Sequence, residues 1–315
     1  MNGVFKKIVG FVASVVLLLG VAVSLSACGD NQTAAKGSKD NPIKFGVVGL
    51  ADEQWTILKE DLEKEGIYVE YSNFTDYTQG LIALSEGSLD INQSVHAFLL
   101  SNYNVKNGYA AGNDKYLRAI GSKAVFPLGM YPNISRGVKS IDDIRQGDTV
   151  VIPNDASNTA RALLELQDAG LVVLKDGGSP LSTLTDIDSD ASKVNVKTVD
   201  AGQVPPLLSD PQIVAGITNN DHIRSIGIQP SESIYLADPS SEASKVYTNV
   251  FAVRASDTDN ELYKKIVRIA SNDKRWLDEV VLESAGTAVV TVDTVSPEDL
   301  SVLQDKIEAN IRAKN

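Results

Sequence analysis

The sequence predicts an α/β protein with two lobes, two crossings of the chain between them, and a ligand cleft where the lobes meet. Short apolar runs alternate with helical patterns after residue 42, and this alternation restarts near the middle of the chain. The chain has 315 residues, which suits two domains of ~100–200 residues each. We expect residues 42–132 and 248–315 to form lobe 1, and residues 133–247 to form lobe 2.

The first block alternates strand and helix patterns. A buried strand is expected at residues 43–48. Apolar residues spaced three and four apart, with acids opposite, predict a helix over residues 52–65 that ends at Gly66. A strand at 67–71 and a helix over 78–86 follow. Such an order is typical of a parallel sheet that is covered on both faces.

The second block begins after the turn signal Tyr131–Asn133. Ser140 and Asp143 have the spacing of a capping box and predict a short helix. A strand at 149–153 then precedes a helix over 157–169. Further strands are expected at residues 194–199, 212–217 and 247–253, then helices that include Trp276, Leu277 and a charged segment from Pro297.

Residues 1–27 have the features of a secretory signal peptide. Lys6 and Lys7 precede a long apolar run, and small residues lead directly to Cys28. This arrangement resembles the lipobox of bacterial lipoproteins, which implies cleavage before Cys28 and lipid on its thiol. The alternative is an uncleaved signal anchor, because the apolar run is almost long enough to cross a bilayer. Residues 28–41 are polar and are expected to form the lipidated cysteine and a flexible tether.

The composition argues against several function classes. Lys and Arg number 29 against 41 Asp and Glu, a net charge of −12, whereas a nucleic-acid-binding protein needs a basic surface. One cysteine and two histidines, His96 and His222, leave little material for a disulfide framework or a metal centre. We therefore expect no metal, no cofactor and no nucleic-acid partner. The sequence also lacks the G-x-S-x-G and G-x-x-x-x-G-K-[ST] motifs of hydrolases and nucleotide-binding loops.

The segment from Ile152 to Arg161 predicts an anion site. The strand ends at Pro153, Ser157 or Asn158 can cap the next helix, and Arg161 is expected in its first turn. A cation there opposes the helix dipole unless a bound anion offsets it, and a guanidinium fork matches a carboxylate. The alternative is a solvated Arg161 that pairs with Glu165 one turn later.

Several motifs in order resemble one known family. They are Phe74-x-Asp76-Tyr77, Asp90-x-Asn92-x-x-x-His96, Pro153-Asn154-Asp155-x-x-Asn158-x-x-Arg161, Ala201-x-Gln203-x-Pro205, Gln212-Ile213 leading to Asn219, and Tyr247-x-Asn249. The set is similar to the NlpA/MetQ family of methionine-binding lipoproteins and covers essentially the whole chain after the tether. This resemblance implies a type II periplasmic-binding-protein-like fold that closes on an amino acid and delivers it to a membrane permease.

The resemblance also implies roles for individual residues. Arg161 and Asn158 would hold the ligand α-carboxylate, and Asn219 and Asn249 would orient the amino-acid head group. For the two latter asparagines, ordinary turn chemistry and capping remain an alternative.

Tyr77, His96, Ser94 and Phe126 would line the pocket for the ligand side chain. A structural role is the alternative for His96, and a place in the apolar core is the alternative for Tyr77.

Three positions depart from the family pattern. Ser94, Leu99 and Ala124 stand where the family usually has aromatic residues, whereas Phe126 and Pro127 are retained. Methionine thioethers pack favourably on aromatic rings. Methionine is thus the default ligand, and an amino acid with another side chain or a short peptide is the alternative.

Together these features predict a monomeric, non-enzymatic substrate-binding protein of an ABC importer. We expect it on the extracytoplasmic face of the cell membrane, anchored through lipid on Cys28, with hinges near Tyr131–Asn133 and Tyr247–Val250. A surface lipoprotein without a transport role and a secreted hydrolase are the alternatives.

Overall fold

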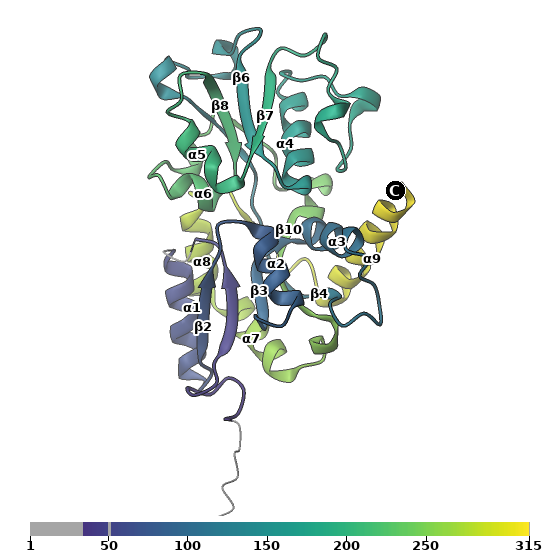
Figure 1. The fold of residues 1–315 in the computed structure, drawn as a ribbon. Coiled ribbons are helices and arrows are strands. Elements are labelled where there is room, and N and C mark those ends of the chain that lie inside the picture. Colours follow the sequence, from purple (N-terminus) through teal and green to yellow (C-terminus); the bar gives the residue numbers. More distant parts are fainter. Residues whose placement is uncertain (1–33, 50–51, 315) are drawn as a thin grey trace, which may run out of the picture. The chain divides into compact units, whose positions relative to one another are not determined.

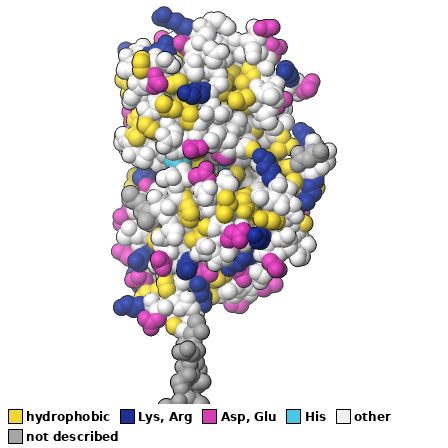
Figure 2. Space-filling model, viewed as in Figure 1, with side chains coloured by type: hydrophobic (Ala, Val, Ile, Leu, Met, Phe, Trp, Pro, Cys, Tyr) yellow, Lys and Arg dark blue, Asp and Glu magenta, His cyan; other side chains and the backbone are white. Residues whose placement is uncertain are grey.

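The computed structural model describes residues 34–49 and 52–314, which belong to one compact unit, residues 34–315. The expected signal peptide and Cys28 lie outside the described residues. Within the described part, no helix is both long and apolar enough to cross a membrane. On the face shown in Figure 2, acidic and basic side chains are interspersed and form no basic patch.

The first sheet has the strand order β11-β4-β10-β3-β1-β2 (Figure 1). β1 pairs in parallel with β2 and β3, whereas β10 pairs antiparallel with β3 and β4. Its strands are β1 (Ile43–Val47), β2 (Val69–Asn73), β3 (Ile91–His96), β4 (Leu117–Val125), β10 (Thr248–Arg254) and β11 (Val289–Val290).

Helices cover both faces of the first sheet. Successive side chains of β10 point to opposite faces of the sheet, and both faces are apolar. Phe251 and Val253 belong to one apolar core, and Val250 and Ala252 belong to the other. The helices on these faces are α1 (Glu53–Lys64), α2 (Tyr77–Ser85), α3 (Ala97–Lys106), α7 (Glu261–Asn272), α8 (Lys274–Glu283) and α9 (Pro297–Lys314). Two filled cores fix the ends of β3 and β10, where the site residues begin.

The second sheet has the order β7-β6-β8-β5-β9. β6 pairs in parallel with β7 and β8, and β5 pairs antiparallel with β8. Its elements are β5 (Gly129–Pro132), β6 (Thr149–Pro153), β7 (Asn195–Val199), β8 (Ile213–Thr218), β9 (Tyr235–Leu236), α4 (Ala156–Asp168), α5 (Val204–Leu207) and α6 (Asn220–Arg224). Val150 and Ile152 pack on the α4 side, whereas Val151 packs on the α5 side.

We use lobe 1 for the first sheet and its helices, and lobe 2 for the second. The chain crosses between the sheets at residues 126–128 and again at residues 237–247. The sequence places residues 129–132 in lobe 1, but they form β5 of the second sheet, because Gly129 and Tyr131 pair with Thr218 and Gly216. The first crossing therefore precedes the hinge expected at Tyr131–Asn133.

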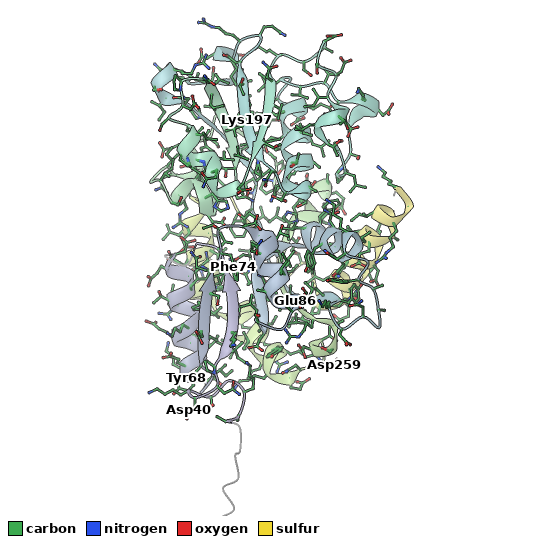
Figure 3. All side chains as sticks on the ribbon, in the orientation of Figure 1. Asp40, Tyr68, Phe74, Glu86, Lys197 and Asp259 are labelled. Atoms are coloured by element: carbon green, nitrogen blue, oxygen red, sulfur yellow. The ribbon has the colours of Figure 1, made fainter. Side chains whose placement is uncertain are left out.

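The parallel strands β1, β2 and β3 of the first sheet and β6, β7 and β8 of the second point their carboxyl ends toward one another (Figure 1). Phe74 follows β2 and lies at the end of lobe 1 that is nearer the second sheet, whereas Tyr68 and Asp40 lie at the opposite end (Figure 3). Lys197 lies on β7 in lobe 2. Side chains that follow the strands of both lobes therefore meet in one region.

Close packing of α7 on β4 depends on a glycine. A methyl group on Gly121 would overlap Cγ1 of Val267 in α7. We expect Gly121→Ala to lower the free energy of unfolding by about 1–3 kcal/mol, because the helix must shift. Urea unfolding measures this change. Gly202→Ala is the control, since its methyl group would come no closer than 3.6 Å to its neighbours. Equal stability of the two variants would contradict the packing argument.

Candidate binding site

One narrow cavity brings together all eight residues that the sequence predicts for ligand binding. They come from both lobes and from the first crossing. Leu99 and Asp221 complete the lining. The residues predicted for the ligand are Tyr77, Ser94, His96, Phe126, Asn158, Arg161, Asn219 and Asn249.

Strand pairing builds the wall that lobe 1 contributes. Asn249 on β10 lies directly opposite His96 on β3 in the antiparallel ladder. Ser94 lies two residues before His96, so its side chain is on the same face of the strand. Ser94 Oγ accepts a hydrogen bond from the Val48 backbone N–H at 2.6 Å. The register of two strands thus positions three of the predicted side chains.

His96 is buried and neutral. Burial, together with the nearby charge of Arg161, lowers its pKa to about 3, while the Asn158 side chain acts in the opposite direction. Its Nδ1 accepts from the Leu99 backbone N–H at 3.1 Å and caps α3, so the structural role considered for this residue is real. Because Nδ1 is an acceptor, the proton of the neutral ring lies on Nε2. Nε2 is buried and forms no hydrogen bond of normal length and angle, although the Asn158 side chain lies near enough to favour the protonated ring.

The helix α4 starts earlier than the sequence predicts. Asp155 is its N-cap, and its carboxylate accepts from the backbone N–H and the side-chain Nδ2 of Asn158, each at 3.0 Å. Neither Ser157 nor Asn158 is the cap, because Asp155 occupies that position with extended backbone. Capping by Asp155 orients the Asn158 amide, whose Oδ1 is buried and has no partner.

Arg161 lies in the second turn of α4 rather than in the first, since the helix begins at Ala156. Its Nη2 donates to the Phe126 carbonyl at 2.6 Å, and its guanidinium lies 4.4 Å from the centre of the Tyr247 ring. The side chain is buried, and this burial lowers the pKa of Arg161 from its usual value.

Arg161 does not pair with Glu165, the local alternative. Both carboxyl oxygens of Glu165 are buried without hydrogen-bond partners, and burial holds its pKa well above the usual value. A protonated Glu165 carries no charge to neutralise Arg161. Among the described residues, Arg161 therefore forms no ion pair. A buried guanidinium of this kind is suited to an anion.

Asn219 and Asn249 do not have the roles that ordinary turn chemistry would give them. Asn219 precedes α6 but makes no side-chain cap hydrogen bond, and its Oδ1 is buried without a partner. Asn249 lies within β10 rather than in a turn. The cavity thus contains amide groups that can bind a ligand ammonium without adding a full buried charge.

Asp221 and Tyr247 contribute to the site, but neither was among the residues predicted to bind the ligand. Asp221 follows β8 and accepts a hydrogen bond from Tyr77 Oη at 3.1 Å, which joins the two lobes. Its position two residues after Asn219, a predicted site residue, is the sequence feature that could have identified Asp221. Tyr247 stacks on Arg161 and has its ring centre 5.3 Å from that of His96. The sequence predicts Tyr247 in a family motif and in the second hinge, and only the fold brings its ring, at the end of the second crossing, onto Arg161 of lobe 2.

Further contacts between the lobes lie beside the cavity. The Tyr77 and His222 rings meet edge to face at 5.3 Å. Arg224 of lobe 2 pairs with Asp52 at 3.1 Å and approaches Glu283 at 3.5 Å, and both acids belong to lobe 1. The lobes are therefore in contact around the site. In the described part of the chain, no group of three or more potential ligands could hold a metal ion.

The two sheets, the two crossings and a polar cavity at the strand ends define a two-lobed solute-binding protein. The model of the NlpA lipoprotein family matches residues 43–290, and the chain belongs to this family.

Curated and solved relatives agree with this assignment. The D-methionine-binding lipoprotein MetQ of Escherichia coli K12 is 32% identical over 266 residues, which cover 83% of this chain and 91% of the relative. The crystal structure of PG110 from Staphylococcus aureus has a TM-score of 0.74 at 29% identity and covers 84% of this chain and 99% of its own. A nutrient-binding protein from Burkholderia cenocepacia bound to methionine has a TM-score of 0.69 at 32% identity, with coverages of 79% and 99%.

The contact between the lobes predicts a pH dependence of stability. Burial, together with the nearby charges of Glu283 and Asp221, raises the pKa of Asp52 from 3.8 to about 7, while Arg224 and Lys123 act in the opposite direction. Between about pH 4 and pH 7 the unfolded chain has lost this proton and the folded chain keeps it. The contribution of Asp52 to stability therefore decreases as the pH rises through this window. Asp52→Asn stays neutral, so its melting temperature relative to the wild type should increase from pH 4.5 to pH 8.

Thermal unfolding at several pH values measures this difference. Asp259→Asn is the control, because the Asp259 side chain is 97% exposed and lies far from the site (Figure 3). A constant difference between Asp52→Asn and the wild type across this range would contradict the raised pKa.

Proposed function

We propose that the protein is the substrate-binding protein of an ABC importer and that it binds an α-amino acid between its lobes. The observation that carries this proposal is a buried guanidinium without an acidic partner, in one cavity with unpartnered asparagine oxygens. An α-amino acid offers the matching pair of charges. Its carboxylate would accept from Arg161, with His96 Nε2 as a further donor, and its ammonium would donate to Asn219 and Asp221.

The relatives make methionine the first ligand to test. One curated relative is named for D-methionine, and one solved relative is described as bound to methionine. The residues proposed to bind the head group, such as Arg161 and Asn219, fit the carboxylate and ammonium of any α-amino acid, methionine included. Ser94 and Leu99 in the lining supply no aromatic ring for a thioether. The residues that bind the head group therefore do not determine which ligand side chain the protein prefers.

Binding without catalysis is part of the proposal. Ser94 Oγ accepts from the Val48 backbone, and His96 Nδ1 accepts from the Leu99 backbone. The two side chains are thus engaged with main-chain groups rather than with each other as a nucleophile and base.

Lobe closure is the expected response to ligand. Arg161 contacts Phe126 at the first crossing and Tyr247 at the end of the second. A carboxylate bound there would contact both points about which the lobes can move. This location supports capture between the lobes and release to a permease when they separate.

The proposed anchor is lipid on Cys28, with the folded monomer on the extracytoplasmic side of the membrane. The lipobox-like sequence and the family's designation as lipoproteins support this proposal. Two or more acyl chains give stable attachment. Residues 29–33 and the described residues that follow would connect this anchor to the fold.

Replacement of Arg161 tests the function. We expect the melting temperature of the form that begins at Gly29 to rise by several degrees with its amino-acid ligand, since ligand at 100 times Kd stabilises by about 2.7 kcal/mol. Arg161→Ala should weaken this ligand at least about tenfold, because it removes charged hydrogen bonds from a buried site. A panel of L- and D-amino acids by thermal shift, followed by calorimetric titration, measures both effects.

Arg145→Ala is the matched control, since Arg145 is exposed on lobe 2. Unchanged affinity in Arg161→Ala would show that the ligand lies elsewhere. The absence of binding across the wild-type panel would reject amino-acid binding itself.

A further inference from the structure

A second small cavity lies beside the first and shares part of its lining. Ser94, Phe126, Asp221 and Asn249 belong to both. The amino-acid head group proposed above faces these residues, so its side chain can extend into the second cavity. We call this second cavity the side-chain chamber.

The chamber presents hydrogen-bond donors that lack partners. Gln93 on β3 is fully buried, and its Nε2 has no hydrogen-bond partner. Lys123 on β4 is 3% exposed, and its ammonium donates to the Oε1 atoms of Gln54 at 2.5 Å and Gln93 at 3.2 Å. An ammonium has three donors. Within the described residues, one donor of Lys123 and the amide of Gln93 are thus left for a ligand.

Aromatic rings hold Lys123 in place. Its Nζ lies 4.8 Å from the centre of the Trp55 ring, 5.2 Å from that of Phe126 and 5.5 Å from that of Trp276. Such contacts stabilise a desolvated cation. Burial lowers the pKa of Lys123 to about 8, so the group remains mostly protonated at neutral pH.

The chamber also presents acceptors. Asn220 is 3% exposed, and its Oδ1 has no partner. Asp221 accepts from Tyr77 through one oxygen, and a carboxylate has capacity for further donors. A ligand group that both accepts and donates hydrogen bonds could therefore pair with the donors of Gln93 and Lys123 and with the acceptors of Asn220 and Asp221.

The charges in the chamber favour a neutral ligand group. Two acids, Asp221 and Glu283, and a third, Asp52, whose pKa of about 7 leaves it partly protonated at neutral pH, face two bases, Lys123 and Arg224. Glu283 is engaged by the backbone and side chain of Gln54, and Asp52 by Arg224. A second carboxylate would add to this acidic excess. A thioether is a weak acceptor and has no donor, so it would leave the polar atoms of both walls unpaired.

We propose that the side-chain chamber binds a carboxamide at the end of the ligand's side chain, as in L-glutamine or L-asparagine. The amide oxygen accepts from Gln93 Nε2 and Lys123 Nζ, and the amide nitrogen donates to Asn220 Oδ1 or Asp221. This inference rests on the proposed amino-acid site and adds the class of side chain that the site selects.

Calorimetric titration of the wild type with L-glutamine, L-asparagine, L-glutamate and L-methionine tests the proposal. One of the two amides should bind at least about tenfold more tightly than both glutamate and methionine, because a site built for hydrogen bonds discriminates against ligands that leave its groups unpaired. Tighter binding of methionine would overturn the carboxamide assignment and leave the amino-acid function standing. Tighter binding of glutamate would overturn it in favour of an anion site. Absence of all binding would reject the proposed function as well.

Variants of the chamber provide a second readout. Lys123→Met and Gln93→Met should each lose at least about tenfold in affinity for the preferred amide while the affinity for methionine is retained. Lys59→Met is the matched control, because Lys59 is exposed on α1. Circular dichroism establishes that each variant is folded. Equal affinity of folded Lys123→Met and the wild type for the amide would overturn the role of the chamber, and the wild-type ranking stands as a test if a variant does not fold.

Discussion

The site depends on one buried cation. Arg161 is removed from water, has no acidic partner among the described residues, and is held by a carbonyl at one crossing of the chain and a tyrosine ring at the other. A charge in a medium of low polarity is costly unless another group neutralises it. The adjacent acid, Glu165, does not fill this role because burial favours its protonated form. We propose that an anionic group on the ligand neutralises Arg161.

The apolar core of each lobe holds the strand ends at the site in place, whereas the polar contacts between the lobes can change. Each sheet is covered on both faces by apolar cores, which fix the strand ends that carry His96, Asn249 and Asn219. The two lobes meet through polar contacts such as Tyr77 with Asp221 and Arg224 with Asp52. Polar contacts of this kind can break and form again in water at little cost, whereas the apolar cores within each lobe cannot. We therefore expect closure on a ligand to move the lobes as units.

Much of the fold could be predicted from the sequence because local patterns determine it. The expected strand at 149–153 and the capped helix beginning after Ser140 correspond to β6 and to a 3-10 turn at Ile141–Asp143. The eight site residues came largely from ordered family motifs, and they converge in one cavity. Their ligand roles remain predictions, since shared lining of a cavity does not identify what binds there.

The parts that were missed depend on contacts far apart in the sequence. β5 was assigned to the wrong lobe because its partner, β8, lies some 85 residues later, as the pairing of Met130 with Ile217 shows. A lysine such as Lys123 is usually exposed, and its sequence neighbours do not indicate otherwise. The three aromatic rings that surround it come together only in the folded structure. Asp155 was passed over as a cap because several polar residues in succession could serve, and local sequence does not choose among them.

The most direct test of the central claim is the contribution of the ligand's carboxylate. Calorimetric titration of the wild type with L-glutamine and L-methionine, each beside its uncharged α-carboxamide derivative, measures that contribution without altering the protein. Loss of the carboxylate charge should weaken binding of whichever amino acid the protein takes by at least about tenfold. Equal affinity for the acid and its α-carboxamide would contradict the claim that buried Arg161 is completed by a carboxylate.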